Sequence, residues 1–216
     1  MSKMSKNTEI NSNSLAKTPY FTKQHLLLLI TSLLIIIIGI TLDQVTKIYV
    51  STNYSKGVAN DFIGSFLRIT YVTNTGAAFG IGTNDPNSAL AFRIIFAIVS
   101  WLVAFGLIGY LVYLIIKRKQ IKFGLWLILA CVFTGDVGNL IDRTFYKDGV
   151  IDMFDISAWL PNFGIFNVAD AFVVCSVIAL IIYFVVDMVK EEHDKNKIAT
   201  QKAQAIESKD ISGDKK

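Results

Sequence analysis

The fold is decided by the stretch FNVADAFVVCSVIALIIYFVV, residues 166–186. From Ala171 to Val186 it carries no charged residue, and a run of this kind is typical of a helix that lies in the hydrocarbon of a membrane. The run nevertheless opens with Asn167 and Asp170, three residues apart. Because a carboxylate at membrane depth is costly, an ionisable residue there indicates a functional site.

The rest of the chain is equally apolar. Of its 216 residues, 53% are hydrophobic, and the mean hydropathy is +0.50. The apolar residues are concentrated in four long runs. A helix needs roughly 20 residues to cross a bilayer, and three of the four runs reach this length only if a final turn of polar residues is included. We therefore predict an all-α integral membrane protein with four transmembrane helices, at about 26–45, 91–116, 123–142 and 167–187.

Basic residues give the four helices an orientation. Four lysines lie in the N-terminal tail, four basic residues in the segment 117–122, and seven lysines from Lys190 onward, together 15 of the 21 Lys and Arg. A four-helix topology places these three segments on one side of the membrane, so the positive-inside rule predicts that both termini are cytoplasmic. The net charge of +4 reflects this topology, and we expect no nucleic-acid partner.

Polar tails flank a membrane domain at 25–190. Residues 1–24 and 191–216 are rich in polar and charged side chains, so we expect both to be disordered, with room for a short helix in the second. On the outer side, the alternating pattern of residues 66–73 predicts a strand within a small extracytoplasmic β-cradle at about 49–88. A second outer segment is expected at about 144–166.

Polar side chains gather where the predicted helices meet the outer face. Within each helix they are three or four residues apart and therefore share one side. Each has a plainer explanation as an interfacial ion pair, a turn residue or a helix cap, but together they favour a polar pocket just inside the outer leaflet. The residues are Asp43, Gln44, Lys47, Asn74, Asn139, Asp142, Arg143, Asp152, Asn167 and Asp170.

The residue types limit the chemistry of such a pocket. The two histidines, His25 and His193, both flank spans on the cytoplasmic side, which excludes a Ser-His-Asp, Cys-His or His-based zinc site at the outer face. A Ser-Lys dyad using Lys47 or Lys147 stays a weak option. Two close aspartates can share one proton near neutral pH, so that one takes a proton from water while the other protonates or polarises the scissile carbonyl. This predicts aspartyl hydrolysis.

Five blocks of sequence carry a family resemblance. They are DQVTK (43–47), NTGAAFG (74–80), GNLIDR (138–143), VID (150–152) and FNVAD (166–170). In this order, and on four helices, they resemble the signature blocks of bacterial lipoprotein signal peptidase, also called signal peptidase II. The resemblance covers about residues 25–190 and leaves both tails outside it.

The resemblance implies an activity and a set of roles. It implies an aspartic endopeptidase of the bacterial cytoplasmic membrane, surrounded by lipid, that cuts prolipoproteins just before a diacylglyceryl-modified cysteine and uses no metal or organic cofactor. Asp152 and Asp170 would be its catalytic dyad, while the nearby Asp155 lacks the preceding β-branched pair. We expect a monomer. The resemblance gives supporting or substrate-binding roles to Asp43, Lys47, Asn74, Gly76, Asn139, Asp142, Arg143 and Asn167.

One residue departs from the family pattern, and other classes of protein stay open. Asp136 stands where the family usually has a small neutral residue; it could perturb the dyad or pair with Arg143 or Lys47. The main alternative is a small proton-coupled membrane carrier that uses the same carboxylates, although no inverted repeat is visible. A presenilin-like protease is weakened by Phe133, where a GxGD motif needs glycine. A non-enzymatic membrane chaperone would need no dyad.

Overall fold

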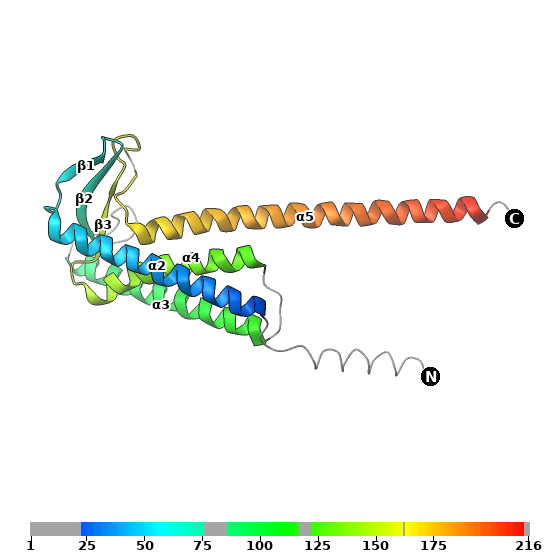
Figure 1. The fold of residues 1–216 in the computed structure, drawn as a ribbon, viewed down its shortest axis with the longest axis horizontal. Coiled ribbons are helices and arrows are strands. Elements are labelled where there is room, and N and C mark those ends of the chain that lie inside the picture. The colour runs from blue at the N-terminus through cyan, green and yellow to red at the C-terminus, as the bar shows by residue number, and fades with distance from the viewer. Residues whose placement is uncertain (1–22, 76–85, 117–121, 162, 214–216) are drawn as a thin grey trace.

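Four long helices and a small sheet make up the described part of the chain (Figure 1). The computed structural model describes residues 23–75, 86–116, 122–161 and 163–213. All four helices are long and apolar enough to cross a membrane, which confirms the predicted fold class. The elements are α2 (Lys23–Asn53), β1 (Ala59–Ile63), β2 (Leu67–Asn74), α3 (Pro86–Ile116), α4 (Phe123–Phe145), β3 (Val150–Asp155) and α5 (Val168–Gly213).

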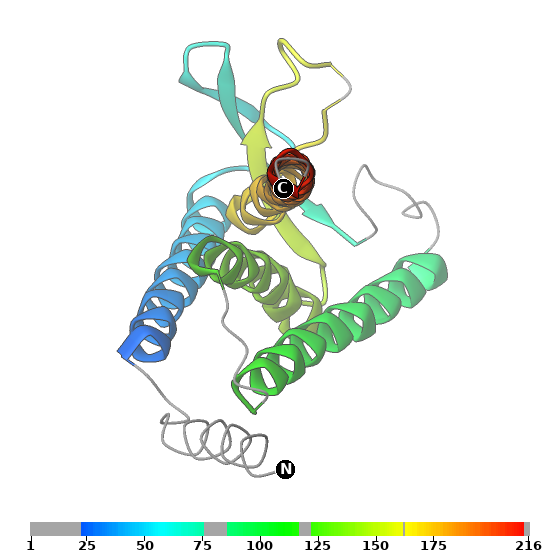
Figure 2. The same ribbon diagram turned by 90° about the vertical axis from the view of Figure 1, so that its right-hand side faces the viewer.

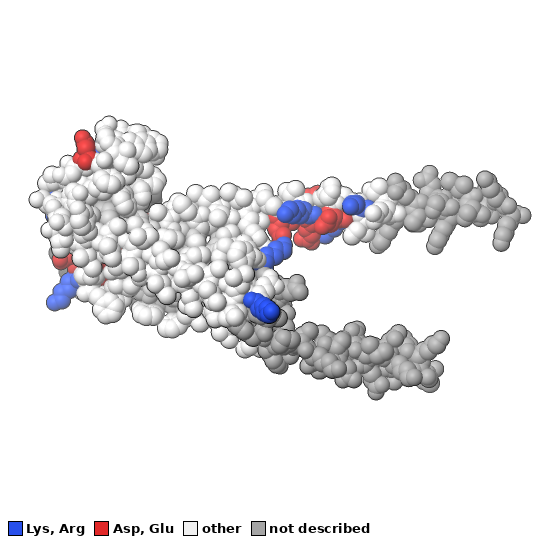
Figure 3. Space-filling view, viewed as in Figure 1, with Lys and Arg blue, Asp and Glu red and all other residues white. Residues whose placement is uncertain are grey.

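Helix α4 lies at the centre of the bundle and packs against α2, α3 and α5 (Figure 2). The outer surface of the bundle is apolar: Ile37, Leu102 and Ile181 are each more than half exposed. Figure 3 shows Lys, Arg, Asp and Glu gathered near the two ends of the described bundle, with an uncharged band between them. Such a band is the surface that lipid covers, since hydrocarbon solvates apolar side chains but not charges.

Glycines let α4 approach its neighbours closely. A Cβ atom at Gly138 would lie 2.8 Å from the Cβ of Ala169 on α5 and 2.9 Å from Oδ2 of Asp43 on α2. At Gly135 it would lie 2.5 Å from the carbonyl oxygen of Ala169. Membrane helices associate without a hydrophobic driving force between them, so small residues that allow close backbone contact are the usual means of packing.

The sheet sits at the end of the bundle away from the long extension of α5 (Figures 1 and 2). Its strand order is β1-β2-β3, and both pairs are antiparallel. The register sets Asp152 opposite Val72, and Val150 opposite Asn74. Gly149 precedes β3 with φ +93°, and a side chain there would also meet the carbonyl oxygen of Asn74 at 2.4 Å. The turn into β3 therefore requires glycine.

A small apolar cluster fixes the sheet to the helices. Val50 near the end of α2 is buried with Ile69 of β2 and with Ile151 and Met153 of β3. The strand expected at 66–73 is confirmed as β2. The residues of the sheet differ from the expected cradle at 49–88. Residues 49–53 belong to helix α2, and the third strand comes from 150–155, within the second expected outer segment.

The C-terminal tail differs from the expected disorder. Helix α5 runs without a break from Val168 to Gly213, 46 residues, far beyond the expected end of the span at about 187. From Met188 onward the sequence is rich in Lys, Glu, Ala and Gln, which are strong helix formers, and it has no glycine before Gly213. An ion pair between Glu191 and Lys195 at 2.8 Å has the favourable i,i+4 order. The expected N-terminal tail falls, except for Lys23 and Gln24, outside the described residues.

The close contact at Gly138 gives a stability test. We expect Gly138→Ala to lower the thermal stability of the purified protein in detergent, because the added methyl group meets Ala169 and Asp43. Overpacking of this kind costs about 1–3 kcal/mol. The matched control is Gly106→Ala in α3, where an added Cβ has nothing within 4 Å. Equal melting temperatures for the two variants would contradict the close approach of α4 to α5.

Candidate active site

A buried lysine on α2 joins this helix to α4 near the sheet. Nζ of Lys47 lies 2.7 Å from Oδ2 of Asp43 and 2.8 Å from Oδ2 of Asp142. The three residues are each 1% exposed or less. Gln44 donates a hydrogen bond to Oδ1 of Asp142 at 3.0 Å. Removing charges from water is costly unless they are paired and hydrogen-bonded, and this cluster meets both conditions.

The same cluster positions the start of α5 and of β3. Oδ1 of Asp43 accepts a hydrogen bond from the backbone N–H of Ala169 at 2.8 Å. Oδ2 of Asp142 accepts one from the backbone N–H of Ile151 at 3.2 Å. Two carboxylates that neutralise Lys47 therefore also hold the two segments that carry Asp170 and Asp152.

Asn167 and Asp170 cap α5 reciprocally. Oδ1 of Asn167 accepts the backbone N–H of Asp170 at 2.9 Å, and Oδ2 of Asp170 accepts the backbone N–H of Asn167 at 3.1 Å. This is the arrangement of a capping box, which satisfies donors that the first turn of a helix leaves free. The carboxylate at the mouth of the span thus has a structural role through one oxygen.

The other oxygen of Asp170 belongs to a second network. It accepts a hydrogen bond from Nδ2 of Asn139 at 2.8 Å. Oδ1 of Asn139 in turn accepts bonds from Nζ of Lys47 at 3.2 Å and from Nδ2 of Asn167 at 3.0 Å. Asn139 therefore connects the buried lysine to Asp170, and its amide orientation is set from both ends.

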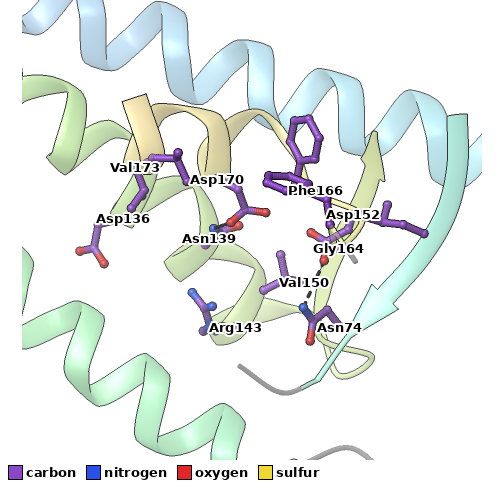
Figure 4. Close-up of a pocket in the computed structure, with 14 residues that line it drawn as sticks. Asn74, Asp136, Asn139, Arg143, Val150, Asp152, Gly164, Phe166, Asp170 and Val173 are labelled. Atoms are coloured by element: carbon purple, nitrogen blue, oxygen red, sulfur yellow. Dashed lines mark hydrogen bonds between the residues drawn. The ribbon is translucent and has the colours of Figure 1, made fainter. Parts of the chain in front are cut away.

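Asp152 is held by two asparagine side chains. Its Oδ1 accepts a hydrogen bond from Asn167 at 2.7 Å. Its Oδ2 accepts one from Asn74 at 3.2 Å, which Figure 4 shows. Asp152 is only 3% exposed. The pairing of β3 with β2 supplies Asn74, and the cap of α5 supplies Asn167, so the position of Asp152 depends on tertiary contacts.

Asp152 and Asp170 point into the same pocket, from β3 and α5 (Figure 4). The pocket has a volume of about 330 Å³ and is also lined by Asn74, Asn139 and Arg143. Burial, and after it the charge of Asp170, raise the pKa of Asp152 to about 7, against the hydrogen bonds from Asn74 and Asn167, which lower it. A carboxyl group with a pKa near 7 beside a second carboxylate can exchange a proton at neutral pH.

Asp155, the neighbouring candidate, faces another environment. It pairs with Arg68 at 2.7 Å and accepts hydrogen bonds from Thr70 and from the backbone of Ser157. It is not among the residues that line the pocket. Burial opposes its ionisation, but the bonds from Ser157 and Thr70 and the charge of Arg68 leave its pKa below the usual value. Its geometry is that of a structural ion pair.

The remaining predicted residues are placed as follows. Arg143 lines the pocket, with its guanidinium 5.8 Å from the ring centroid of Phe96. Asp136 also lines the pocket, but among the described residues it makes no ion pair with Arg143 or Lys47 within 4 Å, so that one of the options considered for it is not realised. Asp136 and Arg143 are seven residues apart on α4, which separates them by about 10 Å along the helix axis. Gly76 lies outside the described residues.

Sequence reasoning missed Arg93. Its Nε donates to the carbonyl oxygen of Arg143 at 3.0 Å, and its guanidinium also donates to that of Lys147 at 2.9 Å. It thereby satisfies carbonyl groups at and beyond the C-terminal end of α4, where a cation is favoured. The sequence does show a basic residue near the predicted outer end of the second span. It does not show that this residue binds the carbonyl groups of Arg143 and Lys147.

Comparison with known proteins identifies the family. Residues 35–186 match the family described as signal peptidase (SPase) II. The chain belongs to the signal peptidase II family. Among curated relatives, a lipoprotein signal peptidase of Latilactobacillus sakei is 38% identical, covering 75% of this chain and 99% of its own length. One of Streptococcus pneumoniae is 34% identical, with 75% and 94% covered.

Solved structures agree with this assignment. A bacterial membrane enzyme structure at 2.3 Å resolution is 32% identical with a TM-score of 0.61, and the match covers 73% of this chain and 89% of the other. A second, at 1.9 Å resolution, has a TM-score of 0.59 at the same identity and covers 71% and 92%. This signal peptidase II is therefore a multi-pass membrane protease, and the carrier alternative has no support.

The buried lysine gives a second stability test. We expect Lys47→Met to destabilise the protein strongly, by about 3–5 kcal/mol, because Asp43 and Asp142 lose the cation that they share. The measurement is thermal unfolding in detergent. Lys122→Met is the matched control, since Lys122 pairs with Asp187 at an exposed position and should change the melting temperature little. A Lys47→Met protein as stable as the control would contradict the role given to the cluster.

Proposed function

We propose that this signal peptidase II is an aspartyl endopeptidase that removes signal peptides from prolipoproteins, with Asp152 and Asp170 as its catalytic dyad. The observation that carries the proposal is the convergence of these two carboxylates on one pocket, each held by asparagine side chains. A pKa of about 7 for Asp152 beside the charge of Asp170 supports the sharing of one proton.

The two aspartates divide the work by their surroundings. Asp152, whose pKa is raised to about 7, is the member that carries the shared proton, and Asp170 takes a proton from the attacking water. Asp152, protonated, gives its proton to the carbonyl oxygen of the scissile bond, forming a tetrahedral diol. When the C–N bond breaks, Asp170 returns its proton to the leaving amine, and the carboxyl product forms as Asp152 regains its own.

Hydrogen bonds to both carboxylates fix their directions. Asn139 orients Asp170 and is itself anchored on Lys47. Asn74 and Asn167 orient Asp152 from the two sides of its carboxyl group. Groups that are held before substrate arrives need no reorganisation during the reaction, and this preorganisation is a large part of enzymatic rate enhancement.

The walls of the pocket suit a lipidated substrate. Phe163, Val173 and Val174 line it, and Val174 and Phe163 are 50% and 40% exposed on the apolar outside. A peptide can therefore reach the dyad while acyl chains stay in lipid, which supports cleavage before a diacylglyceryl-modified cysteine. The clusters of basic residues at 117–122 and after Lys190 support cytoplasmic termini and a pocket near the outer face of the bacterial cytoplasmic membrane.

The dyad is tested by cleavage of a diacylglyceryl-modified prolipoprotein by the purified protein in detergent, followed by mass spectrometry. We expect Asp152→Asn and Asp170→Asn each to lower the rate at least about a hundredfold, because each removes a proton-transfer group. Asp155→Asn, outside the pocket, is expected to stay within a few-fold of wild type. Melting temperatures show whether each variant is folded. If folded Asp152→Asn still cleaves the substrate and Asp155→Asn does not, the partner of Asp170 is Asp155 and the proposed dyad is wrong.

The pH dependence tests the protonated partner. With the pKa of Asp152 at about 7, kcat/KM should fall as the pH rises above about 7, because the proton donor is lost. The hydrogen bond from Asn74 lowers that pKa, so Asn74→Ala should move the fall to higher pH. The measurement is kcat/KM from pH 5 to 9 for both proteins. A fall that moves to lower pH in the variant, or a flat wild-type profile, contradicts the assignment.

A further inference from the structure

Asp136 lines the pocket but has no part in the mechanism described above. It precedes Asn139 by three residues and Arg143 by seven, so all three lie on one face of α4. Figure 4 shows it at the end of the pocket opposite Asn74. Its neighbour Gly135 packs on Ala169 and Val173 of α5, so Asp136 lies level with the first two turns of that helix, on the membrane-interior side of Arg143.

The carboxylate of Asp136 is only half satisfied. Ser100 of α3, itself buried, makes a side-chain hydrogen bond to it. Oδ2 of Asp136 is buried and has no hydrogen-bond partner among the described residues. Buried polar atoms in native proteins are nearly always paired, and leaving one unpaired is costly. Because this unpaired acceptor lies on the wall of the pocket, a hydrogen-bond donor of a bound substrate can pair with it.

The surroundings indicate which donor fits. Arg143 lines the same pocket and its positive charge favours the charged form of Asp136, so a neutral donor can complete the hydrogen bonding of the carboxylate. A peptide strand drawn out of a helix at membrane depth has backbone N–H groups that no water satisfies. A serine or threonine hydroxyl in the same segment offers the same O–H chemistry.

We propose that Asp136 is a substrate-binding residue whose free carboxylate oxygen accepts a hydrogen bond from a neutral N–H or O–H group of the signal peptide, in the segment just before the scissile bond. This inference rests on the proposed function. If the signal peptide stays in the membrane while its end is cut, the residues just before the scissile bond lie at the membrane-interior end of the pocket, where Asp136 is. The residue binds the substrate and takes no part in the proton transfers of Asp152 and Asp170.

The test measures kcat and KM for wild type, Asp136→Ala, Asp136→Asn and Ser100→Ala. The substrates are diacylglyceryl-modified prolipoproteins that carry either Ser or Ala at each of the three positions before the modified cysteine. We expect Asp136→Ala to lower kcat/KM roughly tenfold, as for loss of a hydrogen bond to a charged group, mainly through KM. Asp136→Asn keeps an acceptor oxygen and should lose less.

The substrate pairs separate the two sources of the donor. A loss that is equal for Ser and Ala substrates indicates a backbone N–H, and a loss confined to one Ser substrate indicates its hydroxyl; both support the proposal. Ser100→Ala removes the hydrogen bond from α3 to Asp136 but keeps the carboxylate, so it should lose less than Asp136→Ala.

Two results overturn the inference. One is Asp136→Ala kinetics within twofold of wild type on every substrate. The other is an equal loss in Ser100→Ala, which would make Asp136 a packing residue between α3 and α4. Wild-type cleavage in the same assay keeps these results distinct from failure of the proposed function, which would leave every substrate uncut.

Discussion

The pocket at the sheet end of the bundle depends on the pairing of Lys47 with Asp43 and Asp142. The lysine lies within 2.8 Å of both carboxylates, and all three are buried. Each carboxylate has a second oxygen or lone pair to spare, and each uses it on a backbone N–H: Asp43 on the start of α5, Asp142 on β3. An ion cluster of this kind is strongly destabilised when one member is removed, so the geometry of the pocket and the folding of the bundle are linked.

Several polar side chains here combine structural and chemical roles. Asp170 caps α5 through Oδ2 and presents Oδ1 to Asn139. Asn167 caps the same helix through Oδ1 and holds Asp152 through Nδ2. In a membrane every buried polar group needs a partner inside the protein, and sharing partners keeps the number of polar atoms at membrane depth small. Asp136 leaves one buried oxygen unpaired at the pocket wall, and the proposed contact with substrate would pair it.

The helices could be predicted from sequence because a membrane-spanning helix requires only a long enough run of uncharged, apolar residues. A run such as 171–186 has no charge and enough length, and neither property depends on what the helix touches. The strand at β2 followed from its alternation, whereas β3 could not be assigned to the same sheet, because its pairing with β2 joins residues about 80 positions apart. The extension of α5 is longer than the short helix for which the expected disorder left room, because its polar residues are also good helix formers.

By itself, the sequence determined the four spans, the family and the set of polar residues at one end of them, because hydropathy, charge and ordered motifs are properties of the chain read in one dimension. Only the tertiary structure decided what each polar residue does. It placed Asp155 on Arg68 and Asp152 on Asn74 and Asn167, although the two aspartates are three residues apart. It also gave Asp136 a hydrogen bond from Ser100 instead of an ion pair with Arg143 or Lys47. The physical reason is that burial and hydrogen-bond partners, which set the protonation of a carboxyl group, come from segments that are distant in sequence.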